Sequence, residues 1–241
     1  MGTRLAVKVA SGLAAKQFGA IARRQLIAEG ISAAQVRSWL RSGRLHRIYP
    51  GVYAWGRAEL SLEGQLAAAL LYSGKGAALG SLSMLWWRGM LGRQPQVVHI
   101  DAPGRAASLP GLEIRHPVAI HRTEHRGLPI VAFPDALIAA ATTLPHNTLR
   151  LVIARAEFQR IATLSAIEAA VRPGRRGGLA VRTALAAHLP QLARCENRLE
   201  RAFVLLCESG GVEIPEPNVR NGRYRPDMTW ERQRLIVELD G

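Results

Sequence analysis

Cysteine is scarce in this chain, with Cys195 and Cys207 as its only two among 241 residues. We place both in one expected helix, where a rise of ~1.5 Å per residue would separate them by about 18 Å, too far for a disulfide. The sequence has neither a CxxC pair nor a Cys/His cluster at ligand spacing, so it gives no support to a zinc site. The few thiols suit a reducing cytoplasm, and we expect a cytoplasmic protein whose metal, if it has one, binds through oxygen.

Long apolar runs are also missing. Hydrophobic residues make up 48% of the chain and mean hydropathy is +0.03, yet no stretch approaches the ~18 apolar residues of a membrane helix. Near the N-terminus, Arg4 and Lys8 precede a short apolar run that Lys16 soon interrupts, so we expect no signal peptide. We therefore expect no membrane span and a globular protein of one or two domains with a small third.

Acidic residues are few, and lysine is nearly absent beside arginine. Three Lys and 29 Arg face 18 Asp and Glu, for a net charge of +14. Residues 1–56 hold nine basic residues and one acid, Glu29, whereas residues 190–241 hold eight basic and nine acidic residues. More than half of the excess charge therefore lies at the N-terminal end, and we expect that end to contact double-stranded DNA.

Two short helices are expected in this basic head, Ile21–Ala28 and Ser32–Ser42. Gly30 ends the first helix. The second begins with Ser-x-x-Gln, a capping box whose side chains satisfy free amides of the first turn. Val36 and Leu40 stand four residues apart in it and are expected to face the core.

The segment "RLHRIYPGVYAW" follows these helices and predicts two short strands around a Pro50-Gly51 turn. Helix, tight turn, second helix and hairpin together predict a winged helix-turn-helix over residues 1–56. If the second helix enters the major groove, side chains opposite its buried face and on the wing reach bases or phosphates. The alternative is a winged helix that docks a protein. The candidate DNA-binding residues are Gln35, Arg37, Ser38, Arg41, Arg44 and Arg47.

The hydrophobic pattern of residues 57–171 predicts a compact α/β domain. Residues 172–189 are expected to form a basic linker and a helix. "GLPIVAFPDALIAAATTLP" predicts a strand and then a helix that begins near Pro134, and two packed helices are expected after Leu60. The other expected elements are strands at Val97–Ile100 and Leu112–Arg115, a further segment at Val118–His121, and helices at Thr148–Gln159 and Leu164–Val171.

The closing stretch predicts a β-hairpin, because Val219–Trp230 and Leu235–Asp240 flank a polar loop at residues 231–234. With a loop of four or two residues, the numbers of paired residues sum to 465, which sets Asp227 opposite Glu238. Their Cβ atoms would lie about 4.5–5.5 Å apart, where like charges oppose folding unless a cation separates them. Asp240 would project from the same face. A hard divalent cation fits three such carboxylates, and the alternative is three solvated surface acids.

A helix is expected before this hairpin. Leu199, Phe203 and Leu206 form an apolar stripe along it, and Glu200 sits at the edge of the stripe, where it can border a cleft. Glu196 competes for that role. The alternative for both is a solvated carboxylate paired with a nearby arginine, for which the candidates are Arg194, Arg198 and Arg201.

Two resemblances extend this interpretation. The head, "GISAAQVRSWLRSGRLHRIYPGVYAWG", resembles the N-terminal winged-helix domain of AbiEi-type antitoxins from type IV toxin–antitoxin systems. The segments "LGSLSMLWWRGM" and "GLPIVAFPDALIAAA" look like the region that follows it in proteins of this architecture. The resemblance implies binding to DNA and, in the antitoxin alternative, a cognate toxin as partner.

The tail, from "RLERAFVLLCESGG" to "YRPDMTWERQRLIVELDG", is similar to the start of a nuclease domain related to very short patch repair endonucleases, in the PD-(D/E)XK group. That resemblance implies Mg²⁺ or Mn²⁺ bound by Asp227 and Glu238, with Glu200 as a further catalytic carboxylate. Asp240 is a further catalytic candidate on different grounds, because it would project from the same face as Glu238. Asp240 stands where the group has lysine, and the chain stops before the later strands and helix of such domains. We therefore expect the carboxylates but little nuclease activity from these 241 residues.

The sequence thus predicts a mixed α/β (α+β) protein with a winged helix, an α/β middle, and the N-terminal part of a restriction-endonuclease-like domain at residues 190–241. The leading hypothesis for its function is a DNA-binding protein with a magnesium-dependent endonuclease-like domain. The alternative is a non-enzymatic antitoxin that represses transcription from its own promoter.

Overall fold

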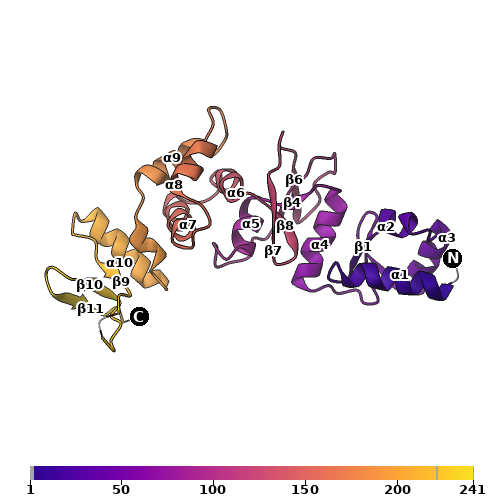
Figure 1. The fold of residues 1–241 in the computed structure, drawn as a ribbon, viewed down its shortest axis with the longest axis horizontal. Coiled ribbons are helices and arrows are strands. Elements are labelled where there is room, and N and C mark those ends of the chain that lie inside the picture. The colour runs from indigo at the N-terminus through magenta and orange to yellow at the C-terminus, as the bar shows by residue number, and fades with distance from the viewer. Residues whose placement is uncertain (1–2, 221, 241) are drawn as a thin grey trace. The chain divides into compact units, whose positions relative to one another are not determined.

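The computed structural model describes residues 3–220 and 222–240, and its fold is mixed α/β, as the sequence predicts (Figure 1). The chain divides into two compact units, residues 1–136 and 137–241. The domain boundaries expected from the sequence, after residues 56, 171 and 189, stay predictions. Along the described part of the chain, no helix is both long and apolar enough to cross a bilayer.

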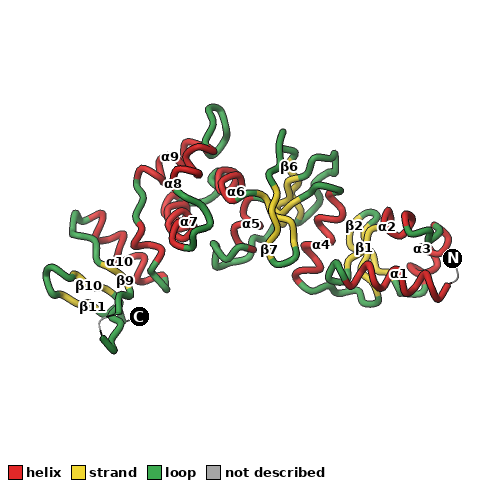
Figure 2. The backbone as a smooth tube through the Cα atoms, in the orientation of Figure 1, coloured by secondary structure: helices red, strands yellow, loops and turns green. Residues whose placement is uncertain are grey.

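The first unit begins with the predicted winged helix, in which three helices pack on a small antiparallel sheet of order β1-β3-β2 (Figure 2). The wing is the β2–β3 hairpin, and Pro50 and Gly51 form its turn, as predicted. Trp39 of the third helix meets Trp55 of the wing edge to face, with ring centroids 5.1 Å apart and planes at 80°. The elements are α1 (Thr3–Ala15), β1 (Ala20–Ala22), α2 (Arg23–Ala28), α3 (Ala33–Arg41), β2 (Leu45–Tyr49) and β3 (Val52–Trp55).

The first predicted helix starts two residues late. Ile21 and Ala22 belong to β1, because both are buried and pair with β3 of the wing. The helix α2 begins at Arg23, where the Ala22 amide donates to the Gln25 side-chain oxygen at 2.9 Å. Pairing with β3, which is distant in sequence, thus places Ile21 and Ala22 in a strand although their local pattern favours a helix.

The second predicted helix, α3, has the expected ends. Its N-cap is Ser32, whose hydroxyl accepts a hydrogen bond from the Gln35 amide at 3.1 Å. Val36 is buried as predicted, but Trp39 is the second core residue and Leu40 is only half buried. The inward pair is therefore spaced three residues apart rather than four, which equally suits one helix face.

The rest of the first unit centres on a five-stranded sheet of order β6-β5-β4-β8-β7, in which β4–β8 and β5–β6 are parallel pairs. The helix α4 contacts strands of this sheet and strands of the winged helix, so it ties the two parts into one unit. The elements are α4 (Leu62–Ser73), β4 (Ala78–Leu79), α5 (Ser81–Trp87), β5 (Val98–Asp101), β6 (Leu112–Arg115), β7 (Arg122–His125) and β8 (Leu128–Val131).

The further segment expected at Val118–His121 is a loop, in which the Val118 side chain is fully exposed. The next four residues, β7, form the strand instead. Its partner β8 follows after Arg126 and Gly127, whose φ angles of 49° and 73° are typical of the two-residue turn that suits the twist of a hairpin. Turn geometry therefore selects the strand.

The second unit consists of helices and a small antiparallel sheet of order β11-β10-β9. The expected helices Thr148–Gln159 and Leu164–Val171 are confirmed within two residues as α7 and α8, and the predicted linker ends in the expected helix, α9. The elements are α7 (His146–Phe158), α8 (Leu164–Ala170), α9 (Gly178–Ala186), the 3-10 turn η1 (Pro190–Ala193), α10 (Arg198–Ser209), β9 (Glu216–Pro217), β10 (Met228–Trp230) and β11 (Leu235–Val237), while α6 (Phe133–Ala140) spans the boundary between the units.

Arg150 is a buried cation of this second unit, with 4% of its residue surface exposed. Its Nη1 and Nη2 atoms donate to the two carboxylate oxygens of Glu208 at 2.8 and 2.5 Å, and its Nε donates to the Ala187 carbonyl at 2.6 Å. This bidentate pair joins α7 to α10 and to the end of α9.

The two cysteines form no disulfide, as predicted, and both are buried, but they do not share a helix. Cys207 lies in α10, whereas Cys195 lies in the irregular segment between η1 and α10. The helix α10 begins only after Cys195, because Asn197 is its N-cap. The Asn197 side chain accepts a hydrogen bond from the Glu200 amide at 2.9 Å.

Candidate nucleic-acid interface

The outer face of α3 carries the four helix residues predicted to contact DNA. Arg37 and Arg41 are exposed, and Gln35 and Ser38 are half-buried. Arg37, Ser38 and Arg41 lie away from the two core residues of the helix, whereas Gln35 lies one turn before Trp39, at the edge of the buried face. The N-cap at Ser32 fixes the first turn, from which Gln35 projects.

The wing supplies the two other predicted residues, Arg44 and Arg47, and both are exposed. The backbone of Arg44 is fixed at both polar groups, since its amide donates to the Trp39 carbonyl at 2.9 Å and its carbonyl accepts from the Gly56 amide at 2.9 Å. Arg47 pairs with Tyr53 across the hairpin, and a bulge follows it. The arginine side chains thus project from a backbone held to α3 and β3.

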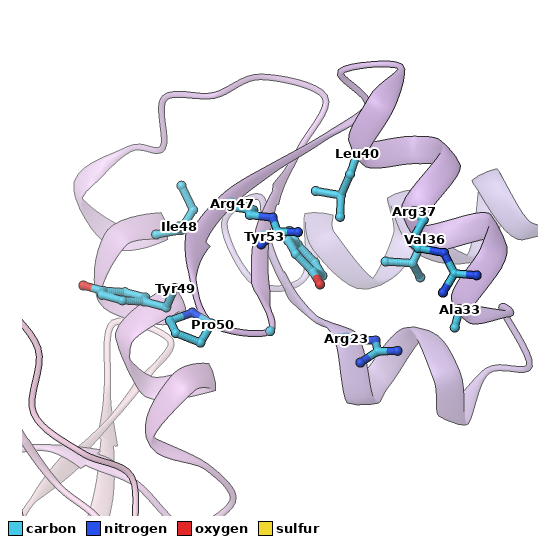
Figure 3. A pocket seen from close by; sticks show the side chains of 11 residues that line it. Arg23, Ala33, Val36, Arg37, Leu40, Arg47, Ile48, Tyr49, Pro50 and Tyr53 are labelled. Carbon is cyan, nitrogen blue, oxygen red and sulfur yellow. The ribbon is translucent and has the colours of Figure 1, made fainter.

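A pocket of about 600 Å³ lies between α3 and the wing (Figure 3). Its floor is apolar, with Val36 and Leu40 from α3 and Tyr53 from β3. Three arginines line it from three elements: Arg37 from α3, Arg47 from β2 and Arg23 from the start of α2. No acidic residue is among its lining residues.

Arg23 is the residue that the sequence interpretation missed. The Arg23-Arg24 pair is visible in the sequence, but the helix predicted from Ile21 would have placed it inside a helix rather than at its start. The Arg23 amide donates to the Gly51 carbonyl at 2.7 Å, which ties the start of α2 to the wing turn. A strand prediction for residues 20–22 would have identified it.

The arginines of α3, the wing and the start of α2 share one electrostatic feature. Among the described residues, none makes an ion pair or a side-chain hydrogen bond with the guanidinium groups of Arg23, Arg37, Arg41, Arg44 or Arg47. Such arginines keep all their donors for an external anion, and a nucleic-acid phosphate is the anion that repeated arginine contacts suit. The arrangement can bind a polyanion without first breaking internal pairs.

The predicted carboxylates lie in the second unit, and the predicted hairpin register is confirmed. Met228 pairs with Val237 and Trp230 with Leu235, so residues 231–234 form the loop. The first strand is shorter than predicted, since β10 begins at Met228. Beyond the paired residues, Asp227 and Glu238 stay adjacent.

Two hydrogen bonds hold these acids side by side. The Leu239 amide donates to Asp227 Oδ2 at 2.8 Å, and the Asp227 amide donates to Glu238 Oε2 at 3.4 Å. Asp240 is exposed. Within residues 3–220 and 222–240, no three histidine, cysteine or acidic side chains gather as a metal-binding set. The roles of Asp227 and Glu238 as metal ligands stay a prediction.

Glu200 is buried, with 2% of its surface exposed, rather than at the edge of an apolar stripe. Its Oε2 accepts from the Glu196 amide at 2.7 Å and from Asn218 Nδ2 at 2.6 Å, and Asn197 Nδ2 donates to its Oε1. Both carboxylate oxygens are thus engaged. Its catalytic role also stays a prediction.

The buried face of α10 runs along Glu200, Val204 and Cys207, so the predicted stripe is wrong. Leu199 and Leu206 are 42% and 65% exposed. Glu196 forms an ion pair with Arg225, whose Nη2 lies 2.5 Å from Glu196 Oε1. Arg225 lies further along the sequence than the three arginines expected as partners. The segment that carries Asn218 and Arg225 brings these two partners to Glu200 and Glu196. The helix periodicity of α10 alone could not predict these contacts.

Comparisons with known proteins bear on the head. No curated protein matches this chain. A crystal structure of the RV2827C protein from Mycobacterium tuberculosis is similar at 18% identity, with a TM-score of 0.49 and 80% of each chain covered. The model of a family described as a transcriptional regulator, AbiEi antitoxin, matches residues 13–54. Over the winged helix, therefore, this chain is similar to the AbiEi antitoxin regulators, as its sequence predicts.

Proposed function

We propose that this protein is a DNA-binding transcriptional regulator of the AbiEi antitoxin type. The observation that carries the proposal is the set of partner-free arginines on α3 and the wing, within the residues that match the regulator family. The function predicted as the alternative is therefore better supported than endonuclease activity.

In this proposal α3 enters the major groove. Arg37, Arg41, Gln35 and Ser38 then face base edges, the first two with fixed positive charge. The wing arginines and Arg23 contact phosphates on the flanking backbone. The apolar floor of the pocket holds α3 and the wing at a fixed spacing, so these contacts are arranged before DNA arrives.

The test is fluorescence anisotropy with the protein and duplex DNA from upstream of its own reading frame, at several salt concentrations. Arg47→Ala should weaken binding to all sequences alike and reduce the slope of log K against log salt by about 1, because one phosphate contact is lost. Arg37→Ala should cost about 1–3 kcal/mol and relax sequence preference. Arg23→Ala should behave as Arg47→Ala does.

Arg232→Ala is the matched control, since it removes the same charge from an exposed arginine in the hairpin loop of the second unit. If this variant loses as much affinity as Arg47→Ala, binding follows net charge and the interface is not on α3 and the wing. Absence of binding at the lowest salt would contradict the proposal itself.

A cognate toxin is the further partner that we propose, because the family is one of antitoxins. Co-expression with the product of the neighbouring reading frame should relieve growth inhibition by that product. Arg47→Ala should leave this protection intact if the winged helix acts on the promoter, whereas its loss would link protection to DNA binding.

A second candidate function is magnesium-dependent DNA cleavage, favoured by the adjacent Asp227 and Glu238 carboxylates. Magnesium or manganese bound there would supply a polarised water and charge stabilisation at a phosphodiester. Asp227→Asn should lower Mn²⁺ affinity in calorimetry and abolish any nicking of supercoiled DNA, with DNA affinity unchanged. Glu231→Gln, in the exposed loop of the same hairpin, is the control. Equal Mn²⁺ affinity in both variants would remove this candidate.

A further inference from the structure

A second pocket of the first unit, of about 420 Å³, lies away from the outer face of α3. The turn after α1, the helices α2 and α4, the loop after α4 and the β7–β8 hairpin all contribute to it. It shares no lining residue with the pocket between α3 and the wing. Its volume falls in the range of small-molecule sites.

The charged residues of this pocket all have one sign. Lys16, Arg24, Lys75 and Arg122 line it, and no aspartate or glutamate does. Arg24 is positioned by a hydrogen bond from its Nη1 to the Leu71 carbonyl at 2.7 Å, near the end of α4. In the described part of the chain, the side chains of the other three have neither an ion pair nor a hydrogen bond. Cations that line one pocket repel one another, and a bound anion would relieve that repulsion.

The remaining walls are apolar and include an aromatic ring. Leu70 of α4 and Leu128 and Pro129 of β8 belong to these walls. Phe18 also lines the pocket and keeps 39% of its surface exposed. An exposed phenyl ring beside cations suits a ligand that has both a flat ring and an anionic group.

Phe18 is held in an unfavourable backbone conformation, with φ at 54°. Two glycines leave room for it. A Cβ on Gly64 would come within 2.5 Å of the Phe18 carbonyl oxygen, and one on Gly127 would lie 3.2 Å from Phe18 Cζ. Non-glycine residues rarely adopt positive φ unless their surroundings impose it. The surroundings therefore hold the Phe18 backbone, and the ring lies beside Gly127 at the wall of the pocket.

We propose that this pocket binds a small phosphate ester with an aromatic base, a nucleoside mono- or diphosphate. The phosphate would contact Arg122, Lys75 and the free donors of Arg24, and the base would pack against Phe18 and the apolar wall. The proposal goes beyond regulation through α3, because its ligand is small and its residues lie elsewhere. DNA also carries phosphate esters, so the experiment separates the two sources.

Isothermal titration at low salt measures binding of ADP, adenosine and inorganic phosphate to the whole protein. ADP should bind more tightly than either fragment. Arg122→Ala and Lys75→Ala should each weaken ADP binding about tenfold, as expected for a lost hydrogen bond to a charged group. Arg105→Ala is the matched control, an exposed arginine outside the pocket, and should change ADP affinity less than twofold. Both pocket residues are exposed, and equal thermal melts verify that the variants fold.

Three results would overturn the proposal: no ADP binding at millimolar concentration, equal losses in the pocket variants and in Arg105→Ala, or displacement of ADP by duplex DNA together with weaker DNA binding in the pocket variants. The last would make the pocket part of the DNA path. Weaker DNA binding in Arg37→Ala with ADP affinity unchanged supports two separate sites. Failure of the regulator proposal would appear in the DNA titrations alone.

Discussion

At the scale of single residues, burial controls the chemistry of Cys195. This thiol is 2% exposed, and burial raises its pKa to about 12, with the nearby Glu200 carboxylate adding to the shift. Since the thiolate is the reactive form, the native protein should resist alkylation at this position. Burial also raises the pKa of Cys207.

The first prediction uses a Cys207→Ser protein, in which Cys195 is the single thiol. Iodoacetamide at pH 8 should leave the native protein unmodified by mass spectrometry and should label it fully in guanidinium. Labelling of the folded protein as fast as a free thiol such as glutathione would contradict the burial of Cys195.

His99 makes the stability of the first unit depend on pH. Burial lowers its pKa, and Glu113, 3.7 Å away, only partly offsets this. The neutral ring is therefore favoured in the folded state, whereas the unfolded chain takes up a proton near pH ~6.5. The stabilisation is present above that pH and is lost as pH falls below it toward the lowered folded pKa.

The second prediction follows from that sign. Between pH 7.5 and 5.5 the melting temperature of the first unit should fall less in His99→Gln than in the wild type. His125, whose pKa is lowered by burial and then by Arg88 and Arg126, should leave part of the dependence in place. His146→Gln, an exposed histidine of the second unit, is the control and should not change the first transition.

At the scale of elements, α3 depends on its N-cap. Ser32→Ala removes the acceptor of the Gln35 amide and should destabilise the first unit by about 1 kcal/mol. Ser32→Asn retains an acceptor and should lose less. Chemical denaturation followed by circular dichroism measures both, and equal losses would show that the cap contributes little.

Elements with a local cause could be predicted from the sequence. The Ser32 cap begins α3, the Pro50-Gly51 turn sets the wing, and the four-residue loop sets the register of the last hairpin. In each case the information lies within a few residues of the element. The candidate DNA-binding face followed from the same signals, because the outside of α3 is defined once its core residues are known.

Elements with a distant cause could not be predicted. The strand β1 exists because Ile21 pairs with Tyr53, and β4 has only two residues, too few for an alternating pattern. Glu200 is buried because Asn218 meets it from a later turn. Arg23 joins the candidate DNA-binding surface only once β1 is known. Pairing over such separations leaves little trace in local periodicity.

At the scale of the whole molecule, two compact units should unfold in separate steps. Each unit has its own buried cluster, one around Ile21 and Trp39 and one around Cys195 and Trp230. Calorimetry should then give a total enthalpy larger than the van't Hoff enthalpy of either transition. A single two-state transition would show that the units fold as one.

Glu208→Gln identifies which transition belongs to the second unit. The change leaves Arg150 buried opposite a neutral group, and loss of one partner from a buried pair costs about 3–5 kcal/mol, less here because the Glu208 side chain is 38% exposed. Only one transition should move down in temperature. Ser32→Ala should move the other one.

The edge-to-face contact of Trp39 and Trp55 joins α3 to the wing within the first unit. Two indoles at 5.1 Å share their electronic excitations, so their mutual orientation contributes a circular dichroism band of its own in the ultraviolet. A duplex that docks on a rigid head leaves that band unchanged, whereas one that spreads α3 from the wing alters it. Comparison of this circular dichroism band with and without duplex DNA would therefore report whether α3 moves relative to the wing.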